Sequence, residues 1–113
     1  MSTTRTKTEL VRMAWITALR TQGHRKCTGQ FVTCTESIVS VCALGLLAEV
    51  AGIDFSDLDM VDDPRLMSAA GLTSGQCFQV FNMNDGSFGR YRKHTFAEIA
   101  DVVESWFATD KAG

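Results

Sequence analysis

A short basic run stands immediately before a predicted helix start at Thr95, and it follows a Gly-x-x-Gly loop at 86–89. The run is unusual in a chain whose formal net charge is −2. A helix start offers backbone N–H groups and the positive end of its dipole, and Arg forks bind phosphate well. The pattern predicts an anion or phosphate site formed by Arg90, Arg92, Lys93, His94 and the hydroxyl of Thr95.

Two aromatic residues of the same segment, Phe88 and Tyr91, suit stacking on a nucleobase. A second basic cluster, His24-Arg25-Lys26, adds positive charge, and we include His24 and Arg25 among the candidate ligand-binding residues. Both clusters also fit a simpler interpretation, in which they are solvated loops that raise solubility. The sequence leaves these two interpretations open.

Few residues suit catalysis. The histidines are His24 and His94, and His24 beside Cys27 or Cys34 would form a thiol–imidazole pair. No nucleophile elbow, oxyanion-hole signature or phosphate-loop motif accompanies them. We therefore expect a binding protein and not an enzyme. A hydrolase acting on nucleotide signals stays as the less favoured alternative, because cleavage would use the same phosphate-binding residues.

Metal-binding patterns are also weak. The four cysteines form no Cys-x-x-Cys pair, and His24-x-x-Cys27 followed by Cys34 matches no zinc module. The acidic stretch from Asp54 to Asp63 lacks the ligand spacing of an EF-hand, so we interpret it as a solvated loop. We expect no metal ion and no cofactor.

Composition bounds the class of protein. With 113 residues, 45% of them apolar, we expect one domain over residues 1–113 with an ordered core at about 6–109. The negative net charge and the shortness of the basic clusters argue against duplex nucleic acid as a partner. No apolar run reaches membrane-spanning length and the N-terminus has no apolar leader segment, so we expect a cytoplasmic protein that does not bind membranes.

Cap signals predict the helices that position these residues. Their pairs are Thr6 with Glu9, Asp63 with Pro64, Thr73 with Gln76, and Thr95 with Glu98. The first helix carries an apolar stripe composed of Leu10, Val11, Ala14, Trp15, Ala18 and Leu19, with Arg12 and Arg20 off that stripe. The last carries a stripe composed of Phe96, Ile99, Ala100, Val103, Trp106 and Phe107.

Two further segments complete the expected fold. An alternating, β-branched stretch at 27–39 predicts a short hairpin, and the apolar segment Ser40–Gly52 predicts a central helix. The helix that begins after Thr73 contributes Phe81 to the core, and we expect it to stop at the turn Asn84-Asp85-Gly86. The fold class is α+β, mainly α, with about five helices and a short β-hairpin inserted after the first.

Several short motifs of this chain occur, in the same order, in a group of other proteins. They are Trp15-x-x-Ala18-Leu19-Arg20, Val41-Cys42-Ala43-Leu44-Gly45-Leu46-Leu47, Asn84-Asp85-Gly86 and Thr95-Phe96-Ala97-Glu98-Ile99-Ala100. In order and spacing the chain resembles a group of small uncharacterised phage and prophage proteins, over roughly residues 10 to 107. It departs from them at Ala43, where their pattern often has a second Cys. The resemblance implies a phage origin and a shared fold, with no established activity.

Two functional hypotheses follow. The first is a phage accessory protein, acting against host defence in the cytoplasm of the infected bacterium, that sequesters a small phosphorylated or cyclic nucleotide signal without cleaving it. Such a protein would be a homo-oligomer if its sites lie between subunits. The second is an inhibitor or adaptor that binds a host protein through its aromatic residues, with the basic loop steering the encounter.

Overall fold

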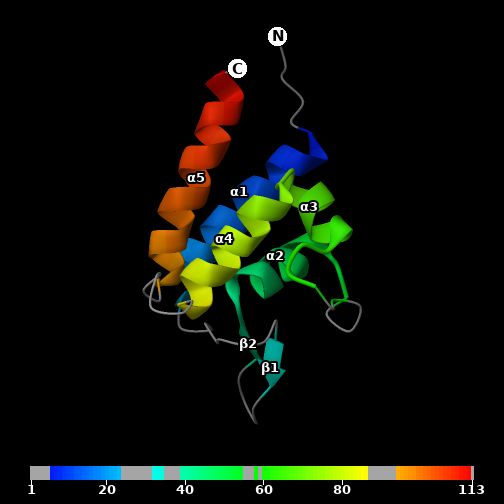
Figure 1. Cartoon of the computed structure of the whole chain (residues 1–113), viewed down its shortest axis with the longest axis vertical. Coiled ribbons are helices and arrows are strands. Elements are labelled where there is room, and N and C mark those ends of the chain that lie inside the picture. Colours follow the sequence, from blue (N-terminus) through cyan, green and yellow to red (C-terminus); the bar gives the residue numbers. More distant parts are fainter. Residues whose placement is uncertain are drawn as a thin grey trace.

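Five α-helices account for most of the residues that the computed structural model describes, which are 6–23, 32–34, 39–54, 58, 60–86 and 94–112. The helices are α1 (Lys7–Thr21), α2 (Ala43–Ala51), α3 (Pro64–Ala70), α4 (Ser74–Asp85) and α5 (Phe96–Ala112). The prediction of a mainly helical fold is confirmed. Helix α1 lies at the centre and packs against α2, α3 and α5, while α4 packs against α2 and α5 (Figure 1).

Two short strands lie between α1 and α2, the first inside the segment 27–39 for which a hairpin was expected and the second mostly beyond it. Strands β1 (Val32–Cys34) and β2 (Val39–Val41) pair antiparallel, with Val32 opposite Val41 and Cys34 opposite Val39. In Figure 1 this pair projects away from the helices, at the end opposite the two termini.

Helix α2 begins later than the sequence predicted. We expected a helix from Ser40, but Ser40 and Val41 belong to β2, and Cys42 is the N-cap residue. The extended backbone of Cys42 lets its Sγ accept a hydrogen bond from the N–H of Gly45 at 3.3 Å. This contact at the cap marks the boundary between β2 and α2. Hydrophobic periodicity alone did not reveal it, because a buried strand and a buried helix can both be apolar throughout.

The four predicted cap pairs are confirmed. Side-chain oxygens of Thr6, Asp63, Thr73 and Thr95 accept hydrogen bonds from N–H groups in the first turns of α1, α3, α4 and α5. The Gln76 and Glu98 side chains also accept from the backbone N–H of Thr73 and Thr95, which completes two capping boxes.

The apolar stripe predicted for α1 is wrong at two positions. Val11, Trp15, Ala18 and Leu19 are buried, whereas Ala14 is exposed and Leu10 is 53% exposed. The core covers a narrower arc of the helix than the sequence pattern marks, since the helices that pack against α1, namely α2, α3 and α5, leave Leu10 and Ala14 uncovered. An apolar arc of α1 is left facing outward.

The core is a single cluster of buried apolar side chains drawn from every helix. Its largest members include Trp15, Phe96, Leu44 and Ile99, each with essentially no exposed surface. Phe81, which we predicted to lie in the core, is only half-buried and packs against the cluster from outside. Cys42 and Cys77 are buried thiols that form no disulfide with each other.

Helix α4 ends where predicted, with Asp85 as its last residue and Gly86 as its C-cap at a φ of +71°. Asn84 has a further role that the sequence did not predict, because in the last turn of α4 it is only 1% exposed. Its Oδ1 accepts a hydrogen bond from the N–H of Ala43 at 3.0 Å, and its Nδ2 donates to Oδ1 of Asp85 at 2.7 Å. Trp15 Nε1 donates to the carbonyl of the same Ala43 at 2.9 Å. Side chains of α1 and α4 thus hold both backbone groups of the first residue of α2.

We expect Asn84→Ala to lower the free energy of unfolding by about 1–3 kcal/mol, because the variant leaves the buried N–H of Ala43 without its acceptor. Gln79→Ala is the control, since Gln79 is exposed on the same helix and its loss should change stability by about 0.5 kcal/mol or less. Urea unfolding followed by circular dichroism measures both. Equal midpoints for the two variants would contradict this role for Asn84.

Candidate functional site

Of the predicted basic site, only His94 and Thr95 lie within the described residues. The other members fall outside them: His24, Arg25, Phe88, Arg90, Tyr91, Arg92 and Lys93. His94 is half-buried, and its backbone N–H donates to the carbonyl of Met83 at 2.7 Å, which ties the start of α5 to the end of α4. The convergence of the basic side chains on one site stays a prediction.

Thr95 uses its polar groups within α5. Its hydroxyl accepts from the N–H of Glu98 at 3.2 Å, and its own N–H donates to Oε1 of Glu98 at 2.9 Å. The Glu98 carboxylate therefore already lies beside the helix start where we expected an anion. A phosphate bound there would share these donors with a carboxylate, so the basic loop would have to supply most of the attraction.

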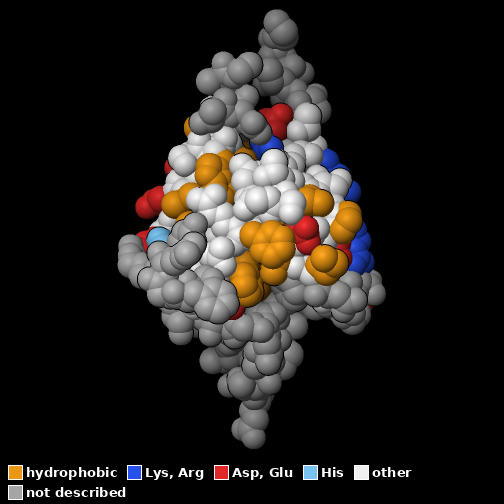
Figure 2. Space-filling view, in the orientation of Figure 1, with side chains coloured by type: hydrophobic (Ala, Val, Ile, Leu, Met, Phe, Trp, Pro, Cys, Tyr) orange, Lys and Arg blue, Asp and Glu red, His pale blue; other side chains and the backbone are white. Residues whose placement is uncertain are grey.

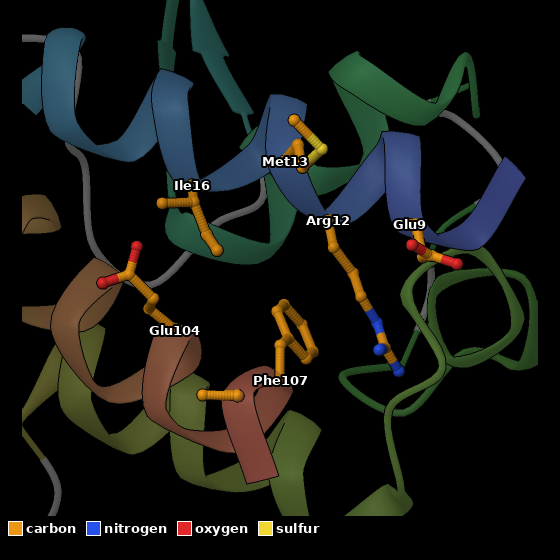
Figure 3. A pocket seen from close by; sticks show the side chains of 7 residues that line it. Glu9, Arg12, Met13, Ile16, Glu104 and Phe107 are labelled. Atoms are coloured by element: carbon orange, nitrogen blue, oxygen red, sulfur yellow. The ribbon is translucent and has the colours of Figure 1, made fainter. Parts of the chain in front are cut away.

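A first groove lies between α1 and α5, and we call it the α1–α5 groove. It has a volume of about 230 Å³ and is lined by Glu9, Arg12, Met13, Ile16, Glu104, Phe107 and Ala108. Figure 3 shows Met13, Ile16 and Arg12 extending from α1, across from Glu104 and Phe107 of α5. Its floor is apolar and its charged residues stand at the rim.

Arg12 is the best-fixed charged side chain of this groove. Its guanidinium carbon lies 4.2 Å from the ring centre of Phe107, and its Nε donates to the carbonyl of Ala70 at 2.7 Å. A Cβ on Gly71, whose φ is +67°, would meet Arg12 Nη2 at 2.6 Å. Sequence periodicity placed Arg12 off the apolar stripe of α1 and did not reveal this contact. The nearest signal was the glycine that follows α3.

Carboxylates outnumber cations along the α5 side of the groove. Arg20 of α1 donates to Asp101 at 2.9 Å and to Glu104 at 3.3 Å, so one guanidinium holds two carboxylates. The hydrogen bond to Asp101 is the main cause that raises the pKa of Arg20 above its ordinary value. All three side chains are at least 38% exposed, so salt screens this cluster and it contributes little to stability.

A second groove lies where α1, α3 and the end of α2 meet, and we call it the α1–α3 groove. It measures about 460 Å³ and is lined by Lys7, Thr8, Val11, Ala51, Ile53, Pro64, Arg65, Ser68 and Ala69. Among the described residues of the lining, the two charged ones are both cations. Figure 2 shows Lys and Arg side chains along the edge of the molecule on the side of α3.

Arg65 is held at the rim of the α1–α3 groove by Asp63. Its Nε and Nη2 donate to the two carboxylate oxygens of Asp63 at 3.0 and 2.9 Å. This pairing lowers the pKa of Asp63 below its ordinary value. The same carboxylate caps α3, so the guanidinium is positioned by the helix start itself.

Cys77 and Ser74 of α4 lie near Asp62, and this environment does not make the Cys77 thiol a nucleophile. Ser74 donates its hydroxyl proton to Oδ2 of Asp62 at 2.9 Å, while Oδ1 of Asp62 is buried without a hydrogen-bond partner. Burial first, and the Asp62 charge second, raise the pKa of Cys77 to about 11. At neutral pH the thiol therefore stays protonated, and only the thiolate attacks electrophiles.

Two further features are absent from the described residues. No three His, Cys, Asp or Glu side chains gather into a group able to hold a metal ion. No helix in the part of the chain that is described combines the length and apolar character needed to span a bilayer.

Compared with protein families, with curated proteins and with solved structures, the chain gives no match. The resemblance to phage proteins therefore stays a prediction.

We expect the stability of the protein to fall between pH 9 and pH 11 in part because of Cys77. Its pKa rises from 9.0 to about 11 on folding, so the unfolded chain loses the thiol proton first and is favoured as the pH increases. The contribution is on the order of 2 kcal/mol, fully present below pH 9 and lost as the pH passes the folded pKa.

Urea unfolding of the wild type and of Cys77→Ala at pH 7 and pH 10.5 tests this. Each protein is its own reference, so the cavity left by the substitution cancels. The variant should lose less stability than the wild type over that interval. Parallel losses would show that Cys77 does not titrate differently in the two states.

Proposed function

We propose that this protein binds a small phosphorylated or cyclic nucleotide in the α1–α3 groove and sequesters it without cleavage. The observation that carries the proposal is a groove of about 460 Å³ whose charged lining residues, among those that the structure describes, are the cations Lys7 and Arg65. In a chain with a net charge of −2, this is a local reversal of sign that favours an anionic ligand.

The size of the groove supports a small molecule. Pockets for such ligands measure roughly 300–1,000 Å³, and the α1–α3 groove lies within that range. The α1–α5 groove, at about 230 Å³, lies below it. A mononucleotide or a compact cyclic nucleotide is therefore the class of ligand that fits the larger groove.

The distribution of side chains suits a ligand with one apolar and one anionic part. Val11, Ala51 and Ile53 provide an apolar floor against which a base or sugar can pack. Lys7, in the first turn of α1, is exposed and supplies a mobile ammonium for the phosphate. The hydroxyls of Thr8 and Ser68 are the neutral hydrogen-bonding groups of the lining.

The lining favours retention over cleavage. The described residues that line the groove include no His, Cys, Asp or Glu, so this part of the lining offers none of the usual general bases. Arg65 is paired with the Asp63 carboxylate, which offsets most of its charge, so the more adaptable Lys7 supplies most of the attraction for an anion. The cations would stabilise the negative charge of a bound phosphoester, but the described lining supplies no base to activate a water molecule for attack.

The biological setting that we propose follows from the resemblance to phage proteins. A protein of this kind would act in the cytoplasm of an infected bacterium by withdrawing a nucleotide signal used in host defence. The basic loop predicted from Arg90 to His94 would then attract the anion or complete the site from another subunit.

A thermal-shift screen with 3′,5′-cyclic AMP, a cyclic dinucleotide and ADP-ribose tests the proposal, followed by titration calorimetry and recovery of the ligand after heating. Lys7→Glu should weaken binding roughly tenfold or more, because it reverses the charge beside the phosphate. Arg20→Glu is the control, since it makes the same charge change at a described residue of α1 that does not line the groove.

Each outcome separates one alternative. A raised melting temperature, intact ligand after heat release and a selective effect of Lys7→Glu support the proposal. Loss of binding in Arg92→Ala with normal binding in Lys7→Glu would move the site to the basic loop. Recovery of a cleaved product would replace sequestration by hydrolysis, and no shift with any probe would overturn nucleotide binding.

A further inference from the structure

The outward arc of α1 carries apolar side chains that the core does not use. Leu10 is 53% exposed and Met13 is 45% exposed, although both belong to a helix whose opposite side is fully packed. Met13 continues into the α1–α5 groove, where Ile16, Phe107 and Ala108 extend the apolar surface (Figure 3). A contiguous apolar strip of this kind marks an interaction surface more often than isolated exposed residues do.

The shape of the strip fits side chains of another protein. A groove of about 230 Å³ is too small for a typical organic ligand but admits one or two Leu-sized anchors. It runs between two helices that pack along each other, α1 and α5. Amphipathic helices bind in such grooves by inserting apolar residues spaced three or four positions apart.

The walls of the groove are fixed before any partner arrives. Phe107 lies between the Arg12 guanidinium, 4.2 Å from its ring centre, and Trp15, whose ring centre is 6.5 Å away. Arg12 is held in turn by the carbonyl of Ala70. Preorganised walls lower the entropy cost of docking, because few side chains must be ordered on binding.

The charged residues at the rim of the α1–α5 groove determine which charge on a partner is favoured. Glu9 and Glu104 line the groove, and Asp101 stands one turn before Glu104 and is 71% exposed. Two guanidiniums stand among these three carboxylates: Arg20 is paired with Asp101 and Glu104, and Arg12 contacts Phe107 and the Ala70 carbonyl. The net charge of these five described side chains is −1, which favours a partner with Lys or Arg beside its anchors.

We propose that the α1–α5 groove docks a basic amphipathic helix of a partner protein. Its apolar anchors would occupy the space beside Met13, Ile16 and Phe107, and its basic residues would face Glu9 and Glu104. The surface is independent of the nucleotide proposal, because the two grooves share no lining residue. One protein would thereby carry a small-ligand groove and a helix-docking groove on opposite arcs of α1.

A fluorescein-labelled synthetic peptide of about 15 residues serves as the probe, with Leu at helical spacing and Lys on both flanks. Fluorescence anisotropy with the full-length protein measures its affinity. A second peptide with Glu in place of every Lys tests the charge argument. We expect the basic peptide to bind and the acidic one to bind roughly tenfold more weakly or worse.

Met13→Glu and Met60→Glu form a matched pair, because both methionines are exposed, at 45% and 60%, and only Met13 lines the groove. Met13→Glu should weaken binding of the basic peptide roughly tenfold, and Met60→Glu should leave it within about twofold. Equal effects of the two variants, or no binding of the basic peptide, would overturn the proposal. So would a dimer in sedimentation that Met13→Glu dissociates, since a second copy would then occupy the groove.

Discussion

The backbone of Ala43 is the point on which this arrangement of helices depends. Its N–H is held by Asn84 of α4 and its carbonyl by Trp15 of α1, and all three residues are buried. A buried helix start must find acceptors for its first N–H groups, or it loses the full cost of desolvating them. Meeting that need with side chains from two other helices fixes where α1 and α4 stand relative to α2. Apolar packing alone is less directional and would tolerate more than one register.

The central position of α1 explains why two grooves flank it. Helix α1 has α2 behind it, α3 on one side and α5 on the other, and each neighbour leaves part of the helix uncovered. The side toward α3 exposes Lys7 and Thr8 of the first turn, whereas the side toward α5 exposes Met13 and Ile16. The same helix therefore presents a cationic groove and an apolar groove with acidic residues at its rim. Because the charges of the α1–α3 and α1–α5 grooves have opposite signs, an anionic ligand and a basic partner would not compete for the same groove.

The groups that most often carry catalysis are occupied structurally in the described part of the chain. The Cys77 thiol is kept protonated by burial, and the Asp63 carboxylate is shared between a helix cap and Arg65. Thr95 and Glu98 use their polar groups on each other. Both described grooves combine charged side chains with apolar ones, an arrangement suited to binding. This is why both proposals are about recognition.

The sequence by itself determined the local structure. Cap residues such as Thr73 with Gln76 and Asp63 with Pro64 predicted helix starts correctly, because a cap is satisfied by residues within the next turn. Only the tertiary structure decided which arc of α1 is buried, leaving Leu10 outside, and why Asn84 sits in the core. Those outcomes depend on contacts between segments about 40 or more residues apart, such as Asn84 with Ala43 and Arg12 with Ala70. Both grooves arise from such contacts, and local sequence patterns carry no signal for them.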